Sequence, residues 1–159
     1  MTITVGDKLP QATLLRVGAN GPEAVDTADL ARGRVALFGV PGAFTGTCTN
    51  AHMPSFVRTA NAFRDKGVDR IVCVTVNDPF VMDAWAKSSD VGDKITMLPD
   101  GNGTLTKALG LEMDGTGYSL GHRSKRFAMV IEDGIVKSVN VEEPGAFAVS
   151  SADAVLDSI

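Results

Sequence analysis

The sequence predicts an α/β domain in which a central mixed sheet carries helices on both faces. Residues 34–40 and 70–76 are continuous apolar runs of the kind found in central strands that are covered on both sides. A helical pattern follows each run, which is the order expected of parallel strands connected by helices. Residues 126–131 and 135–141 are further strands, and the Asp-Gly pair between them favours an antiparallel hairpin. The sheet should therefore contain parallel strands first and an antiparallel pair at one side.

The segments ahead of the first buried strand carry weaker signals. Residues 11–17 are a weak strand candidate, and residues 18–22 are rich in turn-forming residues. Residues 24–33 have a mixed composition in which Asp26 or Thr27 could cap a short turn. We interpret this region as an N-terminal extension followed by a connector.

A kinked helix is expected after the first buried strand. From Met53 to Phe63 the apolar side chains recur at the spacing of one helix face, and Gly67 can end the helix. Pro54 interrupts this pattern because proline lacks an amide hydrogen and its ring crowds the preceding turn. We therefore expect a kink near residues 50–54 rather than a straight helix.

A second helix should follow the strand at residues 70–76. Asn77 and Asp78 can cap this helix, and the proline that comes next suits its first turn. The helix is expected to extend over residues 79–87. Trp85 lies on its apolar face, so the side chain should pack on the sheet rather than bind a ligand.

The last part of the chain offers signals of uneven strength. Residues 95–98 are a short strand candidate, and residues 103–109 could form another helix. The glycine-rich residues 110–121 give no clear prediction. After the hairpin, Ser150 and Ser151 should cap a terminal helix with an apolar face.

Composition and charge restrict the class of protein. With 44% hydrophobic and 21% charged residues, the chain has a globular balance, and its 159 residues suggest a single domain over residues 1–159. The net charge of −4 argues against nucleic acid as the main partner, because phosphate-binding surfaces are normally basic. No apolar run approaches the ~20 residues of a membrane helix, and the first residues lack a signal core. These observations predict a cytoplasmic protein that has no membrane segment.

Cys48 is the residue around which the predicted chemistry is organised. It lies where the first buried strand gives way to a helix, and unpaired helix amides together with the helix dipole favour a negative thiolate there. Pro41 sets the preceding loop, and the Thr45 hydroxyl, three residues before Cys48, can turn toward the sulfur or a bound substrate. Cys48 and Cys73 are too few for a disulfide framework, and no zinc-type spacing is present, so no metal or cofactor is implied.

The chain resembles the peroxiredoxins, and specifically their type II subfamily, in four segments taken in order. They are residues 41–48 (Pro-Gly-Ala-Phe-Thr-Gly-Thr-Cys), residues 76–80, residues 123–128 and residues 147–152. The resemblance implies a thioredoxin-like fold and a thiol peroxidase that reduces hydrogen peroxide and organic (alkyl) hydroperoxides. No nucleic acid or membrane partner is implied.

The resemblance also assigns roles to individual residues. Cys48 is the peroxidatic thiol, which becomes a sulfenic acid, while Thr45 hydrogen-bonds thiolate and peroxide and Pro41 shields the site. An ordinary thiol is only a few per cent ionised at neutral pH, so a cation is needed; Arg126 is assigned this role, with Arg123 as the alternative. We expect the reductant to be glutathione or glutaredoxin in preference to thioredoxin. A homodimer is expected, with loops around the active site at the contact.

Cys73 is a candidate resolving thiol, because type II peroxiredoxins of plants have a cysteine at this spacing. Its place in the middle of a predicted strand speaks against a disulfide with Cys48, which requires α-carbons within ~7 Å. We therefore expect Cys73 to be a buried structural thiol. Recycling of Cys48 would then depend on an outside thiol.

Other functions remain as alternatives. His52 could be the base of a cysteine hydrolase or, with Cys48, a metal ligand, although a supporting contact within the site is the favoured role. Ser119 lies in a Gly-x-Ser-x-Gly pattern typical of esterases, but within a glycine-rich loop rather than a strand-to-helix elbow. Residues 101–103 form only part of a dinucleotide fingerprint. A redox sensor that signals through the Cys48 sulfenate is the remaining alternative.

Overall fold

The computed structural model describes residues 2–159. In chain order the elements are β1 (Thr13–Gly18), β2 (Gly21–Asp26), α1 (Thr27–Leu30), β3 (Arg34–Gly39), the π-helical turn η1 (Cys48–His52), α2 (Met53–Arg58), α3 (Ala60–Asp65), β4 (Arg70–Thr75), α4 (Pro79–Ser88), β5 (Thr96–Pro99), α5 (Thr104–Leu109), β6 (Glu112–Asp114), the 3-10 turn η2 (Thr116–Tyr118), β7 (His122–Ser124), β8 (Phe127–Glu132), β9 (Ile135–Val141) and α6 (Ala152–Asp157).

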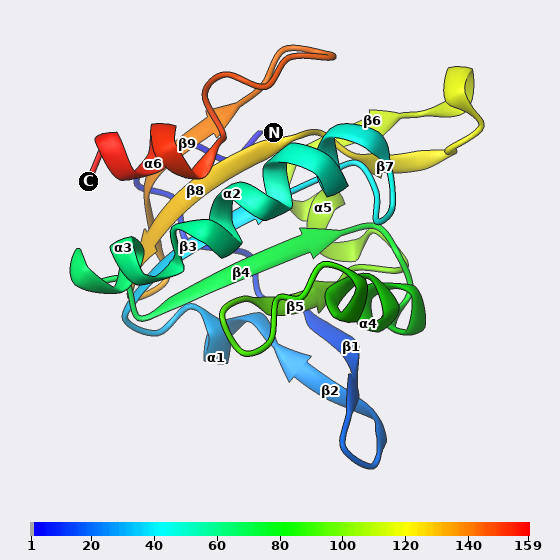
Figure 1. Ribbon diagram of the computed structural model, residues 1–159, viewed down its shortest axis with the longest axis horizontal. Helices are drawn as coiled ribbons and strands as arrows, with labels where there is room; N and C mark the ends of the chain where they lie inside the picture. Colours follow the sequence, from blue (N-terminus) through cyan, green and yellow to red (C-terminus); the bar gives the residue numbers. More distant parts are fainter. Residues whose placement is uncertain (1) are drawn as a thin grey trace.

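A mixed sheet with the strand order β5-β4-β3-β8-β9 forms the centre of the molecule (Figure 1). β3, β4 and β5 are parallel, whereas β8 runs antiparallel to β3 and β9 antiparallel to β8. Asp133 and Gly134 both have positive φ in the β8–β9 turn, as a tight hairpin of matching twist requires. The predicted arrangement of parallel strands with an antiparallel pair at one side is confirmed.

Each face of the sheet packs against its own set of elements, as predicted. On one face, side chains of α2, α3, α4 and α6 bury the sheet together with Cys48 and Cys73. On the other face, α1, α5 and the β1–β2 hairpin cover the sheet. In Figure 1, α2 and α3 cross the near face, while α5 lies behind the sheet. The predicted packing of Trp85 is also observed, because its side chain is fully buried in the first core.

The first long helical segment is broken twice. The kink expected near residues 50–54 takes the form of the π-helical turn η1, which ends at His52, two residues before the proline at position 54. A second break, at Thr59, separates α2 from α3 and has no signal in the sequence. The Thr59 hydroxyl donates to the Ser55 carbonyl (2.7 Å), a bond of the kind that bends helices.

Two hairpins lie where the sequence gave no strand pair. Residues 21–26 pair with β1 over six positions, although they were expected to be turn and connector. In the glycine-rich region, β6 and β7 pair over three positions and form a finger that projects from the sheet (Figure 1). Three-residue strands show too little alternation to be recognised, and pairing with a partner strand decides their conformation.

Candidate active site

The loop between β3 and η1 carries Cys48 into the first core. Gly46 and Thr47 are already helical, so Cys48 lies in the first helical turn, and its side chain is fully buried. The amide of Ala43 donates to Oδ1 of Asn77 (2.9 Å), which anchors this loop to the end of β4. Asn77 is therefore a support of the loop, while its neighbour Asp78 alone caps α4.

Arg126 reaches the sulfur of Cys48 from a position 78 residues later in the chain. It directly precedes β8, and β8 pairs with β3, the strand that leads into the Cys48 loop. One terminal nitrogen, Nη2, lies 3.1 Å from Cys48 Sγ. Within residues 2–159, no carboxylate forms an ion pair with Arg126, so its charge is not neutralised by an acid.

The close pairing of β3 with β8 depends on a glycine. Gly39 lies opposite Phe127, and a Cβ at this glycine would come within 2.1 Å of the phenylalanine ring. A side chain here would push the start of β8 away from β3. Because Arg126 is the residue before Phe127, such a shift would also move the guanidinium away from Cys48.

His52 contacts the other terminal nitrogen of Arg126. Its Nδ1 lies 3.0 Å from Arg126 Nη1, and its Nε2 lies 2.8 Å from the carbonyl oxygen of Ser150. A guanidinium can only donate and a carbonyl can only accept, so the ring is neutral with its proton on Nε2. Burial, and then the neighbouring Arg126 charge, lower the pKa of His52 from 6.5 to about 3. Since both ring nitrogens are occupied, His52 is not placed to act as a base toward Cys48.

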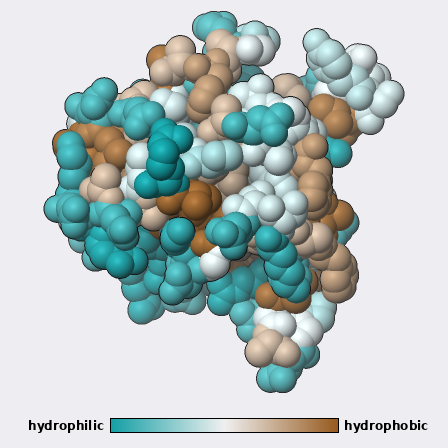
Figure 2. All heavy atoms as spheres, in the orientation of Figure 1, coloured by the Kyte–Doolittle hydropathy of each residue, from teal (hydrophilic) through white to brown (hydrophobic). Residues whose placement is uncertain are grey.

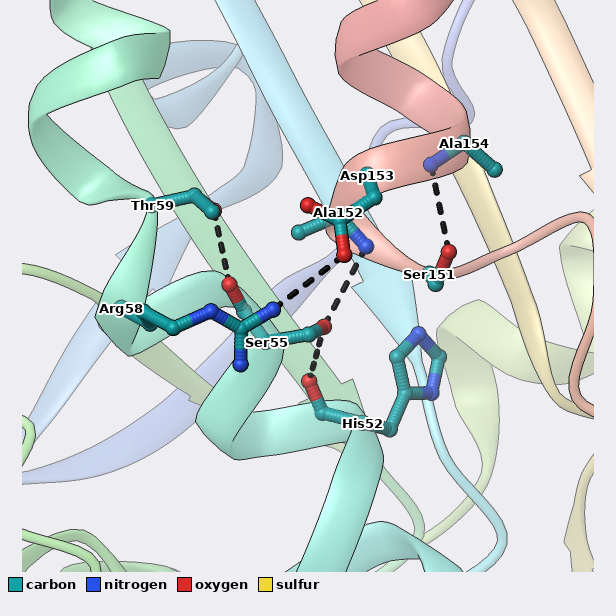
Figure 3. A network of polar contacts seen from close by, with 8 residues as sticks. All are labelled: His52, Ser55, Arg58, Thr59, Ser151, Ala152, Asp153 and Ala154. Carbon is teal, nitrogen blue, oxygen red and sulfur yellow. Dashed lines mark hydrogen bonds and ion pairs between the residues drawn. The ribbon is translucent and has the colours of Figure 1, made fainter.

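The backbone around His52 is fixed by contacts with α6. Ser55 Oγ donates to the His52 carbonyl oxygen (2.7 Å) and accepts from the amide of Ala152 (3.2 Å). Figure 3 shows this bridge, with the His52 ring pointing away from Ser55 toward the segment that leads into α6. The ring also lies against Phe38 and Phe147, with centroid distances of 5.0 Å in both cases.

Thr45 and Pro41 belong to the loop that carries Cys48, and Arg123 contacts this loop. The Thr45 hydroxyl donates to the carbonyl oxygen of Gly42 (2.7 Å), so its oxygen keeps lone pairs for accepting a hydrogen bond. Arg123 donates from Nη1 to the Pro41 carbonyl oxygen (3.4 Å). A Cβ at Gly42 would lie 2.8 Å from that same nitrogen, so a side chain here would displace the Arg123 guanidinium. The structure thus places Arg126 at the sulfur and Arg123 on the loop.

The segment between β9 and α6 supplies contacts that sequence reasoning missed. Ser150 accepts the hydrogen bond from His52, and Phe147 lies with its ring centroid 5.9 Å from the guanidinium carbon of Arg126. Glu142, at the start of this segment, is buried and accepts hydrogen bonds from the backbone that follows it. A single glutamate after an apolar strand carries no sequence pattern that would mark it as part of a site.

Cys73 lies in the middle of β4, opposite Phe38 of β3. The residue is fully buried, and this burial raises the pKa of its thiol well above the usual value. Cys48 and Cys73 are both free thiols in this structure, and they belong to the same core.

The esterase and metal-site alternatives find no matching geometry among residues 2–159. Ser119 is exposed at the end of η2 in the β6–β7 finger, so it does not occupy a strand-to-helix elbow. In the described part of the chain, no three His, Cys, Asp or Glu side chains are grouped so that they could hold a metal ion. Over the same residues, no helix is both long and apolar enough to cross a membrane.

Comparison with known proteins defines the class of this thiol site. A family model described as Redoxin matches residues 4–156. The chain is similar to the chloroplastic peroxiredoxin-2E-2 of Oryza sativa subsp. japonica, with 51% identity over 99% of this chain and 73% of the relative. It is also similar to the chloroplastic peroxiredoxin-2E of Arabidopsis thaliana, with 45% identity over 99% of this chain and 70% of the relative.

A solved structure with the same fold also carries a peroxiredoxin name. This is the reduced Prx3 of Vibrio vulnificus in complex with hydrogen peroxide, which is 45% identical and covers 99% of both chains with a TM-score of 0.94. The chain is thus a thioredoxin-fold redoxin. More narrowly, it belongs to the type II peroxiredoxins, a family of thiol peroxidases, as the sequence resemblance indicated.

The comparisons correct one prediction. A cytoplasmic location was expected from the composition of the first residues, but two relatives that match 99% of the chain are chloroplastic proteins by name. The prediction of a cytoplasmic location is therefore wrong.

Proposed function

We propose that residues 1–159 form one catalytic domain that reduces hydrogen peroxide and small organic hydroperoxides at Cys48. The observation that carries this proposal is the 3.1 Å contact between Arg126 Nη2 and Cys48 Sγ. A guanidinium at this distance stabilises the thiolate, which is the nucleophilic form of cysteine. The relative from Vibrio vulnificus, crystallised with hydrogen peroxide, supports the choice of substrate.

The first step is an attack of the Cys48 thiolate on one peroxide oxygen. An S–O bond forms while the O–O bond breaks, and the leaving oxygen takes up a proton to become water or an alcohol. Sulfur is oxidised to the sulfenic acid and the peroxide is reduced. Arg126 can donate to the peroxide oxygens while negative charge moves from sulfur to the leaving oxygen.

Thr45 and Pro41 orient and enclose the substrate in this proposal. Because the Thr45 hydroxyl proton is given to Gly42, its oxygen accepts a hydrogen bond from the peroxide hydroxyl. Arg126 donates to the peroxide and Thr45 accepts from it, so together they fix its direction relative to the sulfur. Pro41 limits the access of solvent to the thiolate.

Recycling depends on an external thiol in this proposal. The thiol condenses with the sulfenic acid, releasing water and leaving a mixed disulfide, and a second thiol then frees Cys48. We favour glutathione or glutaredoxin over thioredoxin because Cys73 is buried within β4, where it is a poor resolving thiol. A Cys48–Cys73 disulfide in peptide maps of peroxide-treated protein would contradict this choice.

We test the function with the variant Arg126→Lys, which keeps the charge but loses the two-pronged guanidinium. Consumption of hydrogen peroxide should fall by about a hundredfold, because one ammonium cannot contact both Cys48 and His52 in the same way. Assays with glutathione, glutaredoxin and thioredoxin in parallel identify the reductant. Full activity of Arg126→Lys would contradict the role of Arg126, and no turnover with any of these thiols would contradict the peroxidase.

A further inference from the structure

Glu142 is a buried acid whose main-chain amide donates to the carbonyl oxygen of Arg126, and the peroxidase chemistry leaves its carboxylate without a role. One of its oxygens, Oε2, accepts four hydrogen bonds from the chain that follows. The donors are the amides of Ala148 (2.8 Å), Val149 (2.9 Å) and Ser150 (2.8 Å) and the hydroxyl of Ser150 (2.7 Å). The carboxylate therefore fixes three consecutive residues of the β9–α6 segment.

This segment is also the one that fixes His52. The carbonyl oxygen of Ser150 accepts from His52 Nε2 at 2.8 Å, and it thereby forces the other ring nitrogen to be an acceptor. That acceptor, Nδ1, receives the hydrogen bond from Arg126 Nη1. An unbroken series of contacts thus leads from the Glu142 carboxylate to the guanidinium that lies on Cys48.

Glu142 is tied to Arg126 from its backbone as well. The amide of Glu142 donates to the carbonyl oxygen of Arg126 (2.9 Å), so the two residues face each other across the start of β8 and the end of β9. Phe147, one residue before the amides that the carboxylate holds, lies against both the His52 ring and the Arg126 guanidinium. The same loop conformation therefore sets two contacts of the proposed catalytic arginine.

A charged oxygen suits this position. Four donors converge on Oε2, whereas the neutral amide oxygen of glutamine is a weaker acceptor and the rest of that side chain would bring two donors of its own. Although burial acts in the opposite direction, the hydrogen bonds from Ser150, Ala148 and Val149 lower the pKa of Glu142 below its usual value. The acid is thus ionised at neutral pH.

We propose that Glu142 is a positioning residue for the peroxidase reaction, which it serves by holding the Ser150 carbonyl, and through it His52 and Arg126, in register with Cys48. The inference rests on the proposed role of Arg126 at the sulfur. It assigns Glu142 no contact with the peroxide.

The variant Glu142→Gln tests this inference, with Glu143→Gln as its control. Glu143 is the next residue, and its side chain is exposed. Glu142→Gln should lower the second-order rate constant for hydrogen peroxide by about tenfold to a hundredfold, because a small misplacement of a catalytic group has effects of this size. The midpoint pH of Cys48 alkylation by iodoacetamide, followed on the Cys48 peptide by mass spectrometry, should rise. Glu143→Gln should match the wild type in both measurements.

A second set of variants separates positioning from general loss of structure. In an Arg126→Lys background the further effect of Glu142→Gln should shrink to less than about threefold, because the guanidinium that it positions is gone. Ser150→Ala removes one of the four hydrogen bonds to Glu142 and should lower the rate constant for hydrogen peroxide by less than Glu142→Gln does. This variant still tests the inference if Glu142→Gln folds poorly.

The outcomes that contradict the inference are distinct from failure of the proposed function. Wild-type rates and an unchanged alkylation midpoint in Glu142→Gln and Ser150→Ala, with Arg126→Lys strongly impaired, would overturn the role of Glu142 alone. An equal effect of Glu142→Gln in both backgrounds would do the same. Full activity in Arg126→Lys would overturn the proposed role of Arg126 and the inference with it.

Discussion

The two terminal nitrogens of Arg126 contact two different partners, and the contact with one partner fixes the position of the other nitrogen. One nitrogen faces Cys48 Sγ and the other faces His52 Nδ1. The fork of a guanidinium is rigid, so fixing one nitrogen also fixes the direction of the other. A neutral histidine can provide that fixed point without competing for the thiolate, because it adds no charge of its own.

At the residue scale, the sequence resemblance predicted the contact of Arg126 with the sulfur but not the groups that hold this arginine. The places of Cys48, Thr45 and Pro41 follow from one continuous motif, and Arg126 was assigned from the family resemblance. Asn77 accepts a hydrogen bond from the amide of Ala43, which lies in another loop, and Glu142 acts through Ser150, whose carbonyl oxygen meets His52 far away in the chain. Such contacts require no particular spacing, so they become visible only when the sheet brings the segments together.

We predict that His52 makes the stability of the protein decline in mild acid. The unfolded chain takes up a proton on this residue below about pH 6.5, whereas the folded protein takes it up only near pH 3. The contribution of neutral His52 to the free energy of unfolding is therefore fully present above pH 6.5, and it is lost as the pH falls toward 3. Between pH 7.5 and pH 5 this single residue should cost on the order of 2 kcal/mol in the free energy of unfolding.

Urea denaturation of wild type and His52→Gln at these two pH values measures this effect. Glutamine can occupy the same hydrogen bonds without titrating, so its variant should lack most of the decline. The carboxylates and His122 are present in both proteins, so their effects cancel when the two declines are compared. An equal decline in the two proteins would show that His52 is not the cause.

We also predict that Thr45 contributes through its hydroxyl group. Thr45→Val keeps the shape but removes the acceptor for the peroxide, so the rate constant for hydrogen peroxide in stopped-flow experiments should fall by about tenfold to a hundredfold. Thr45→Ser retains the hydroxyl and should stay within a few-fold of wild type. If valine and serine gave the same rate, the hydroxyl would have no role in orienting the substrate.

At the element scale, strong apolar periodicity was sufficient to locate the main strands and helices. β3, β4, β8 and β9 lie within one residue of their predicted bounds at each end, because continuous apolar runs have few other places to be buried. β2, β6 and β7 were not predicted, since each depends on pairing with a partner rather than on its own composition.

The contact between α2 and α6 gives a prediction at this scale. Ser55 is buried, and its hydroxyl joins the His52 carbonyl to the Ala152 amide. Ser55→Ala leaves both backbone groups without this partner, which should reduce the free energy of unfolding by about 1–3 kcal/mol.

Arg58 provides a matched control on the same pair of helices. Its ion pair with Asp153 is visible beside Ser55 in Figure 3, and both side chains are more than 60% exposed (63% and 66%). Arg58→Gln should therefore change stability by less than about 0.5 kcal/mol in the same urea titration. If Ser55→Ala were no more destabilising than Arg58→Gln, the buried bridge would not hold these helices together.

At the scale of the whole molecule, the order of strands assembles the site from distant segments. β3 carries the Cys48 loop at its carboxyl end, and its two neighbours bring Asn77, just after β4, and Arg126, just before β8. This topology was predictable, because a strand–helix–strand order followed by a hairpin leaves few arrangements. The cellular location was not predictable in this way, because targeting signals are recognised by transport receptors and are not determined by how the chain packs.

Exposed apolar residues around the site lead to a prediction about assembly. Phe44, in the Cys48 loop, and Phe80, in the first turn of α4, are 53% and 65% exposed. Figure 2 shows apolar atoms gathered along the edge of the molecule where α4 and the loop after β3 lie. Exposed aromatic groups of this kind are typical of interfaces.

We predict a homodimer whose contact includes these two side chains, and Phe80→Glu should weaken it. Placing a charge where an aromatic group would be buried should raise the dimer dissociation constant by at least about a hundredfold in sedimentation velocity measurements. Tyr118→Glu is the control, because Tyr118 is 85% exposed at the tip of the β6–β7 finger and should leave the dimer intact. A monomeric wild type would contradict the dimer. Equal dissociation constants for Phe80→Glu and wild type would show that the contact lies elsewhere. Because Phe44 belongs to the loop that carries Cys48, loss of the dimer through Phe80→Glu should also lower the rate of peroxide consumption.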